Sequence, residues 1–112
     1  MGWKGMQQNI ESDALEEMKP HAKEASGLMR ALGNEARLMV LCTLAEGERS
    51  VGELNNVVPL SQSALSQQLA RLRRDGLVQT RRESQTIYYS LTSGPANKVI
   101  NVLHEIYCPT RA

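Results

Sequence analysis

The sequence predicts a mainly α-helical fold that carries one small β-hairpin, and three observations support this class. Apolar residues recur at helical spacing over most of the 112 residues. The period changes to alternation only between residues 77 and 91. Aromatic residues make up 4% of the chain and Phe is absent, which favours packing between aliphatic helices. A chain of this length normally forms one domain, so we expect residues 1–112 to fold together.

The first helix is predicted to begin at Asp13, because Asp13 and Glu16 have the spacing of a capping box. Residues 1–12 before it are expected to form a flexible tail. Apolar residues continue at helical spacing to Leu32. Pro20 should kink or restart this helix, because proline lacks a backbone N–H.

Two further helices are predicted from Asn34 to the region of Pro59. Asn34 caps a helix that contains LMVLCTLA, which places Cys42 on or beside the buried stripe. The stretch SVGEL then forms a second capping box, Ser50 with Glu53, and opens a short helix. Pro59 ends that helix.

A helix over residues 61–75 follows after only a few residues. Ser61 caps it, three leucines face inward and Gly76 ends it; the leucines are Leu65, Leu69 and Leu72. Two helices joined by so short a turn form a helix-turn-helix candidate. Residues 77–91 then read as a hairpin, LVQTRR and TIYYSL around the polar turn ESQ, in which Tyr88 and Tyr89 lie on opposite faces.

A last helix over residues 95–108 starts at Ser93, Gly94 and Pro95. Its apolar stripe consists of Val99, Ile100, Leu103, Ile106 and Tyr107. A terminal helix this apolar requires a partner surface, and small helical domains often complete their burial by dimerising.

The outer face of helix 61–75 has the composition of a DNA-reading helix. Net charge is only +1, but five arginines against one acid lie between residues 61 and 82. Hydroxyls and amides suit base edges and phosphates, and arginines near the hairpin turn can reach the DNA backbone or minor groove. A solvated helix face would look similar by itself, but this one is joined to a capped helix and an arginine-bearing hairpin. The predicted DNA-binding residues are Ser61, Gln62, Ser63, Ser66, Gln67, Arg71, Arg81 and Arg82.

No apolar run is long enough for a membrane span, and the N-terminal residues lack the apolar core of a signal peptide. We therefore expect a cytoplasmic chain without membrane contact. Cytoplasmic thiols are kept reduced, so Cys42 and Cys108 are either core residues or a reactive pair.

Four motifs together resemble the winged-helix repressors of the ArsR/SmtB family: LGNEARLMVLCTL, SVGEL, LSQSALSQQLARLRRDGLV and RRESQTIYYSL. The resemblance implies a homodimeric winged helix-turn-helix protein, built largely from its first and last helices, that binds an imperfect DNA palindrome and is released by an inducer. It implies no enzymatic activity and no cofactor.

The family's metal-sensing placements do not match this chain. One puts a Cys-x-Cys after the EL of SVGEL, where Asn55 and Val57 stand. The other needs spaced ligands on the last helix, where His104 and Glu105 are adjacent and point apart. We therefore expect no metal site, although a metal-responsive regulator remains an alternative.

Cys42 and Cys108 resemble the cysteine pair of the subgroup containing HlyU, BigR and SqrR. That resemblance implies a disulfide or polysulfide bridge formed in response to oxidants or reactive sulfur species. Inert core cysteines in a ligand-independent regulator are the alternative. A thiol oxidoreductase is disfavoured, because neither LCTLAE nor YCPTR contains a Cys-x-x-Cys.

Overall fold

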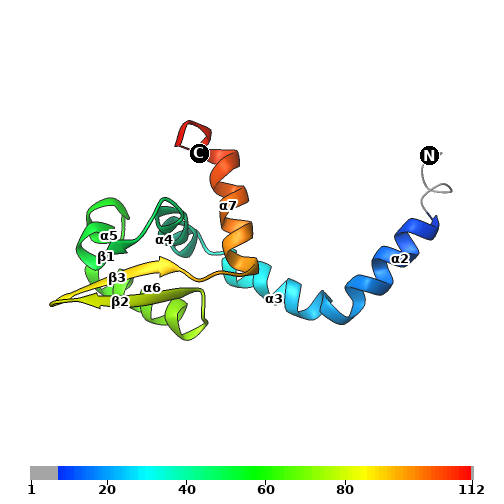
Figure 1. The fold of residues 1–112 in the computed structure, drawn as a ribbon, viewed down its shortest axis with the longest axis horizontal. Coiled ribbons are helices and arrows are strands. Elements are labelled where there is room, and N and C mark those ends of the chain that lie inside the picture. The colour runs from blue at the N-terminus through cyan, green and yellow to red at the C-terminus, as the bar shows by residue number, and fades with distance from the viewer. Residues whose placement is uncertain (1–7, 112) are drawn as a thin grey trace. The chain divides into compact units, whose positions relative to one another are not determined.

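The computed structural model describes residues 8–111, in two units, Met1–Ala31 and Leu32–Ala112. In the first unit, helix α2 (Gln8–Met18) is followed by the 3₁₀ turn η1 (Lys19–His21) and helix α3 (Ala22–Leu32), whose last residue belongs to the second unit. Figure 1 shows the elements in chain order. Pro20 lies in η1, so the predicted restart of the helix is confirmed.

Helix α2 begins before Asp13, so the predicted helix start is wrong. Residues 8–12 contain no Gly or Pro, so no helix-breaking residue prevents the helix from starting before Asp13. The expected tail therefore overlaps α2 in these residues, and its first seven residues lie outside the described part of the chain.

The second unit starts with helix α4 (Glu35–Ala45), strand β1 (Arg49–Ser50) and helix α5 (Val51–Val57). The Asn34 side chain accepts a hydrogen bond from the Arg37 N–H at 3.0 Å and caps α4. The predicted capping box of α5 is confirmed: Ser50 Oγ accepts from the Glu53 N–H at 3.2 Å, and Glu53 Oε1 accepts from the Ser50 N–H at 2.9 Å.

Helix α6 (Gln62–Arg74) follows α5 after a short turn, as predicted for a helix-turn-helix. Strands β2 (Val78–Glu83) and β3 (Thr86–Leu91) form the predicted hairpin, and Ser84 in its turn has a φ of 58°. The antiparallel sheet has the order β1-β3-β2, with Arg49 opposite Tyr89 and Ser50 opposite Tyr88. Strand β1 was not predicted, because a strand of two residues is too short to show an alternating pattern. It is a strand only because it pairs with β3.

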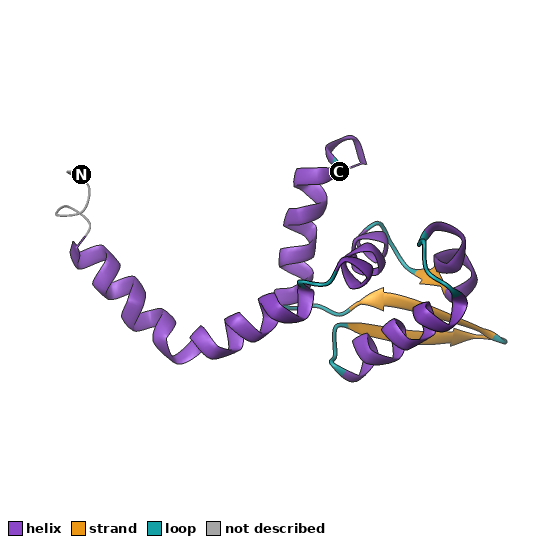
Figure 2. Ribbon diagram, turned by 180° about the vertical axis from the view of Figure 1, so that it is seen from behind, coloured by secondary structure: helices purple, strands orange, loops and turns teal. Residues whose placement is uncertain are grey.

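Helix α7 (Pro95–Tyr107) and the short turn η2 (Pro109–Arg111) end the described chain. Helix α7 packs against α4, and the two lie side by side in Figures 1 and 2. The hairpin runs beside α6 in the same views. Every buried apolar residue of the described chain lies in the second unit; these residues are Leu32, Val40, Leu41, Leu44, Leu54, Val58, Leu65, Leu69, Leu72, Val78 and Ile100.

Apolar side chains also remain on the surface of both units. In α7, Val102, Ile106 and Tyr107 are 52%, 59% and 78% exposed. In the first unit, Leu15 and Met29 are also exposed. No helix in the described range is both long and apolar enough to cross a membrane.

Candidate functional site

Helix α6 separates its leucines from its polar face as predicted. The three leucines are buried, and all polar residues predicted to contact DNA from this helix are exposed: Ser61, Gln62, Ser63, Ser66, Gln67 and Arg71. Ser61 Oγ accepts a hydrogen bond from the Ala64 N–H at 3.1 Å and lies 3.3 Å from Ser63 Oγ. Ser61 is therefore the N-cap of α6, so the helix itself depends on it.

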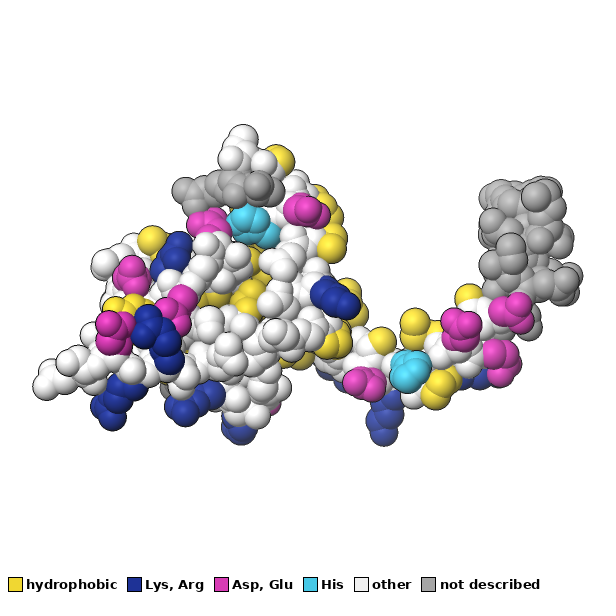
Figure 3. All heavy atoms as spheres, in the orientation of Figure 1, with side chains coloured by type: hydrophobic (Ala, Val, Ile, Leu, Met, Phe, Trp, Pro, Cys, Tyr) yellow, Lys and Arg dark blue, Asp and Glu magenta, His cyan; other side chains and the backbone are white. Residues whose placement is uncertain are grey.

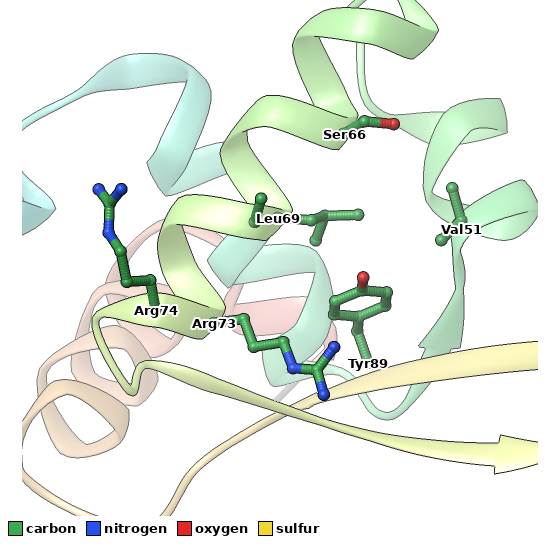
Figure 4. A pocket seen from close by; sticks show the side chains of 7 residues that line it. Val51, Ser66, Leu69, Arg73, Arg74 and Tyr89 are labelled. Atoms are coloured by element: carbon green, nitrogen blue, oxygen red, sulfur yellow. The ribbon is translucent and has the colours of Figure 1, made fainter.

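The two arginines of the hairpin lie in different environments. Because side chains alternate along a strand, Arg81 and Arg82 point to opposite faces of the sheet. Arg82 stands opposite Ile87, is exposed and makes no ion pair with any described residue. It shares its face with Tyr89, which points toward α6 in Figure 4.

Arg81 is held by two carboxylates. Its Nε lies 3.0 and 2.9 Å from the two carboxylate oxygens of Glu48, its Nη2 lies 2.8 Å from Glu48 Oε1, and its Nη1 lies 2.9 Å from Glu83 Oε2. The guanidinium also lies 4.5 Å from the centroid of the Tyr88 ring. Hydrogen bonds to Glu48 and then Glu83 raise the pKa of Arg81. Arg81 thus ties the hairpin to the loop after α4, and a DNA phosphate would have to compete with both carboxylates.

A cavity of about 500 Å³ lies between α6, the start of α5 and strand β3, and we call it the helix–wing notch. Figure 4 shows the residues that line it, among them Val51, Ser66, Leu69, Arg73, Arg74 and Tyr89. Neither Arg73 nor Tyr89 was predicted from the sequence to belong to a site. The run RLRR, residues 71–74, shows in the sequence that the end of α6 is basic. That Tyr89 of β3 lines the same cavity as this run is visible only in the folded chain.

The basic side chains of the second unit gather near this region. Figure 3 shows Lys and Arg side chains along the lower edge of the unit, where Figure 1 shows α6 and the hairpin. Acidic side chains lie mostly above that edge in the same view. One edge of the unit is therefore suited to a polyanion.

The two cysteines come from the packed helices α4 and α7. Cys42 lies in α4, and Cys108 is the C-cap of α7, where its N–H donates to the His104 carbonyl at 2.8 Å. Both are free thiols of intermediate exposure. Burial raises the pKa of Cys42, and the charge of Cys108 raises it further. Because α4 packs against α7, the fold brings the two cysteines to the same pair of helices.

A second polar contact joins the same two helices. His104 Nε2 lies 3.2 Å from Glu46 Oε2, and the two side chains are only 11% and 25% exposed. Glu46 is the C-cap of α4, so this contact fastens the end of α4 to α7 one turn before Cys108. Sequence reasoning missed it because the partners are 58 residues apart. Among the described residues, no group of three His, Cys, Asp or Glu could hold a metal ion.

Comparison with known proteins places this geometry in a family. Residues 34–80 match the family described as bacterial regulatory protein, arsR family. The chain is 52% identical over 94 residues to the transcriptional activator HlyU of Vibrio cholerae serotype O1, a match that covers 84% of this chain and 87% of that protein. The chain belongs to the arsR family. It is thus a DNA-binding transcriptional regulator, and its relatives are regulators rather than enzymes.

Solved structures of arsR-family relatives share the fold. The transcriptional repressor BigR from Xylella fastidiosa is 43% identical, with a TM-score of 0.78 over 87% of this chain and 96% of that one. Reduced HlyU from Vibrio cholerae N16961 is 52% identical, with a TM-score of 0.74 over 82% and 97%. A Mycobacterium bovis protein, 26% identical with a TM-score of 0.64 over 80% and 82%, is described as a homodimeric winged helix-turn-helix DNA-binding domain. The predicted winged helix-turn-helix fold is therefore confirmed.

Proposed function

We propose that this chain is a homodimeric repressor whose binding to an operator is controlled by the dithiol of Cys42 and Cys108. The observation that supports the proposal is that α4, which contains Cys42, packs against α7, which ends at Cys108, so a bridge would join two helices already in contact. The effect of the charge of Cys108 on the pKa of Cys42 agrees with this packing. The Vibrio cholerae relative, which has a structure described as reduced, supports a role for thiol state in this branch of the family.

The dimer follows from the exposed apolar face of α7. Val102, Ile106 and Tyr107 on one helix are unfavourable in water, and a second copy of the chain would bury them. The homodimeric relative supports this assembly. Two copies of α6 would then meet successive major grooves of an imperfect palindrome about 34 Å apart.

Within each protomer we assign residues to base contacts or to phosphate contacts by their exposure and charge. Base edges would be read from the N-terminal half of α6 by Gln62, Ser63, Ser66 and Gln67, while Arg71 and Arg82 would contact phosphates. Ser61 and Arg81 are also proposed at this surface, but their bonds to Ala64 and Glu48 make them positioning residues first.

The sensing chemistry begins at Cys108. Its position at a helix end gives access, whereas the raised pKa of Cys42 leaves that residue mostly as a thiol. The Cys108 thiolate attacks the outer sulfur of a low-molecular-weight persulfide, forms Cys108–S–SH and releases the carrier thiol. Cys42 then attacks the inner sulfur, which yields a Cys42–Cys108 disulfide and hydrogen sulfide. If both cysteines are persulfidated, loss of one hydrogen sulfide leaves a trisulfide bridge.

Peroxide gives the same disulfide by a different first step. Cys108 is oxidised to a sulfenic acid with release of water, and attack by Cys42 releases a second water. A direct disulfide requires Cα atoms within about 7 Å, and extra sulfur atoms relax that demand. A bridge that retains an extra sulfur would therefore identify a reactive sulfur species, whereas a direct disulfide can arise from either kind of signal.

The bridge would act on DNA binding through α7. It would add a covalent tie between α4 and α7 at the end of the dimer helix. A shift of that helix changes the separation of the two copies of α6, and specific binding needs both in register. We expect the reduced protein, which predominates in the cytoplasm, to bind the operator and the bridged protein to release it.

The test combines intact mass with DNA binding. Reduced protein is exposed anaerobically to glutathione persulfide, hydrogen peroxide or zinc, then analysed by mass spectrometry and by fluorescence anisotropy on a duplex selected from a random pool. We expect loss of two hydrogens, or an added mass of about 32 Da per retained sulfur, localised to a Cys42–Cys108 cross-link. Affinity for the duplex should fall in parallel.

Cys42→Ser and Cys108→Ser are the matched controls. Each should bind the duplex like the wild type and keep binding after treatment. If both variants still release DNA on treatment, the dithiol is not the switch. Retained zinc with DNA release would identify a metal-responsive regulator, and unaltered mass and binding under all three treatments would identify a ligand-independent one.

A further inference from the structure

The helix–wing notch has an apolar floor and a basic rim. Leu69 and Val51 supply apolar lining, the Tyr89 hydroxyl points from β3 toward them, and Arg73 extends from α6 beside the Tyr89 ring (Figure 4). No acidic side chain lines the notch within the described part of the chain. A guanidinium and a hydroxyl that line one cavity without a carboxylate form a site for an oxyanion.

Arg73 and its neighbour Arg74 differ in what they contact. Arg74 lies 3.8 Å from the carboxylate of Asp75, and Figure 4 shows its side chain extending away from Tyr89. Arg73 points toward Tyr89 and forms no ion pair with a described residue. Both arginines line the notch, but only Arg73 extends toward Tyr89 and has no ion pair with a described residue.

The notch also borders the surface proposed to read DNA. Ser66 is exposed on α6 and lines the notch, and the face of the hairpin that carries Tyr89 also carries Arg82. When a helix lies in the major groove and a hairpin reaches the neighbouring minor groove, one sugar-phosphate strand must pass between them. In this fold, the space between those two elements is the notch.

We propose that the helix–wing notch binds a phosphate of the DNA strand that separates the two grooves, with Arg73 as the charged contact and the Tyr89 hydroxyl as a second donor. This site rests on DNA binding by the chain but is independent of the thiol switch. It adds a backbone contact on the side of α6 away from its base-reading N-terminus, and so fixes the angle between the helix and the groove.

Salt dependence tests the charged contact. Phosphate contacts do not depend on sequence, so a labelled duplex of about 30 base pairs and arbitrary sequence is a sufficient probe. We expect Arg73→Gln to lower the slope of log Kd against log salt by about 0.9 for each protomer bound. Between 50 and 200 mM salt, the loss of affinity of the variant should therefore be about 3.5-fold smaller per protomer than that of the wild type. Arg74→Gln is the matched control, with the same charge change one residue away, and should lower the slope by less than half as much.

Neutral phosphates locate the site on the DNA. Single methylphosphonate substitutions, each of which neutralises one phosphate, are placed along the selected duplex. At one position per half-site the substitution should weaken binding of the wild type. At that same position it should not weaken binding of Arg73→Gln relative to the unmodified duplex. Tyr89→Phe should weaken binding without changing the slope, because it removes a donor but no charge. Equal thermal stability of the variants would show that the fold is kept.

Equal slopes for the wild type, Arg73→Gln and Arg74→Gln would overturn the proposal, as would a methylphosphonate profile that Arg73→Gln leaves unchanged at every position. Thermal stabilisation by inorganic phosphate that Arg73→Gln abolishes, with no change in DNA slope, would assign the notch to a free anion instead and also overturn it. Failure of the wild type to bind any duplex would refute DNA binding itself, which is a different result from any of these.

Discussion

Ser61 offers the sharpest separation between a structural role and a DNA-binding role. Its Oγ lies 3.1 Å from the Ala64 N–H and caps the helix that carries most of the proposed base-reading residues. Ser61→Ala removes this bond and should destabilise the protein by about 1 kcal/mol. Ser61→Asn and Ser61→Asp can both keep a cap, and Asp also favours the positive end of the helix dipole.

DNA binding should rank the three variants differently from stability. Ser61→Asp adds a negative charge at the surface facing DNA, and at about 6 Å from a phosphate in water this costs about 0.7 kcal/mol, or about threefold per protomer and tenfold for a dimer. Ser61→Asn adds no charge and should bind like the wild type. Of the two variants that keep a cap, Ser61→Asp is thus expected to bind DNA more weakly than Ser61→Asn.

Urea unfolding followed by far-ultraviolet circular dichroism measures the first ranking, at one fixed protein concentration because a dimer is involved. Fluorescence anisotropy on one duplex measures the second. The reasoning fails if Ser61→Ala unfolds at the same urea concentration as the wild type, or if Ser61→Asp is as unstable as Ser61→Ala. Unchanged DNA affinity in Ser61→Asp would move the DNA surface away from the N-terminus of α6.

Three further outcomes are expected. Arg82→Gln should lower the slope of log Kd against log salt by about 0.9 per protomer, and Arg81→Gln by clearly less, because Glu48 already neutralises it; equal slopes in anisotropy titrations would contradict this. In a Cys108→Ser variant, burial still raises the pKa of Cys42, so its alkylation rate should keep rising with pH beyond the ordinary value of 9.0, and a plateau below that value would contradict burial. Leu54→Ala should cost about 2 to 5 kcal/mol in urea unfolding, since Leu54 is fully buried, and a loss below about 1 kcal/mol would place Leu54 outside the core.

Local patterns predicted most of the fold. Capping by Asn34, Ser50 and Ser61 depends only on residues within one helical turn, so it could be predicted from the sequence. The hairpin could be predicted because alternation and a polar turn are also local. The start of α2 was misplaced because a capping-box spacing at Asp13 can also occur inside a helix.

The candidate sites depended on longer contacts. Arg81 looked like a free DNA contact in the sequence, and its pairing with Glu48 arises only when the hairpin packs beside the loop after α4. Cys42 and Cys108 were paired by resemblance to a family, since no local rule joins residues so far apart. The contact between His104 and Glu46, which fastens the same two helices, had no signal in either sequence segment.

The sequence by itself determined the helices, the hairpin, the polar face of α6 and the basic charge near it, because caps, periodicity and composition act between near neighbours. Only the tertiary structure decided which of those charges are free. Packing tied Arg81 to Glu48, turned Arg73 toward Tyr89 and brought the charge of Cys108 to bear on Cys42. Electrostatic interactions depend on distance in space, and that distance is set by how the elements pack.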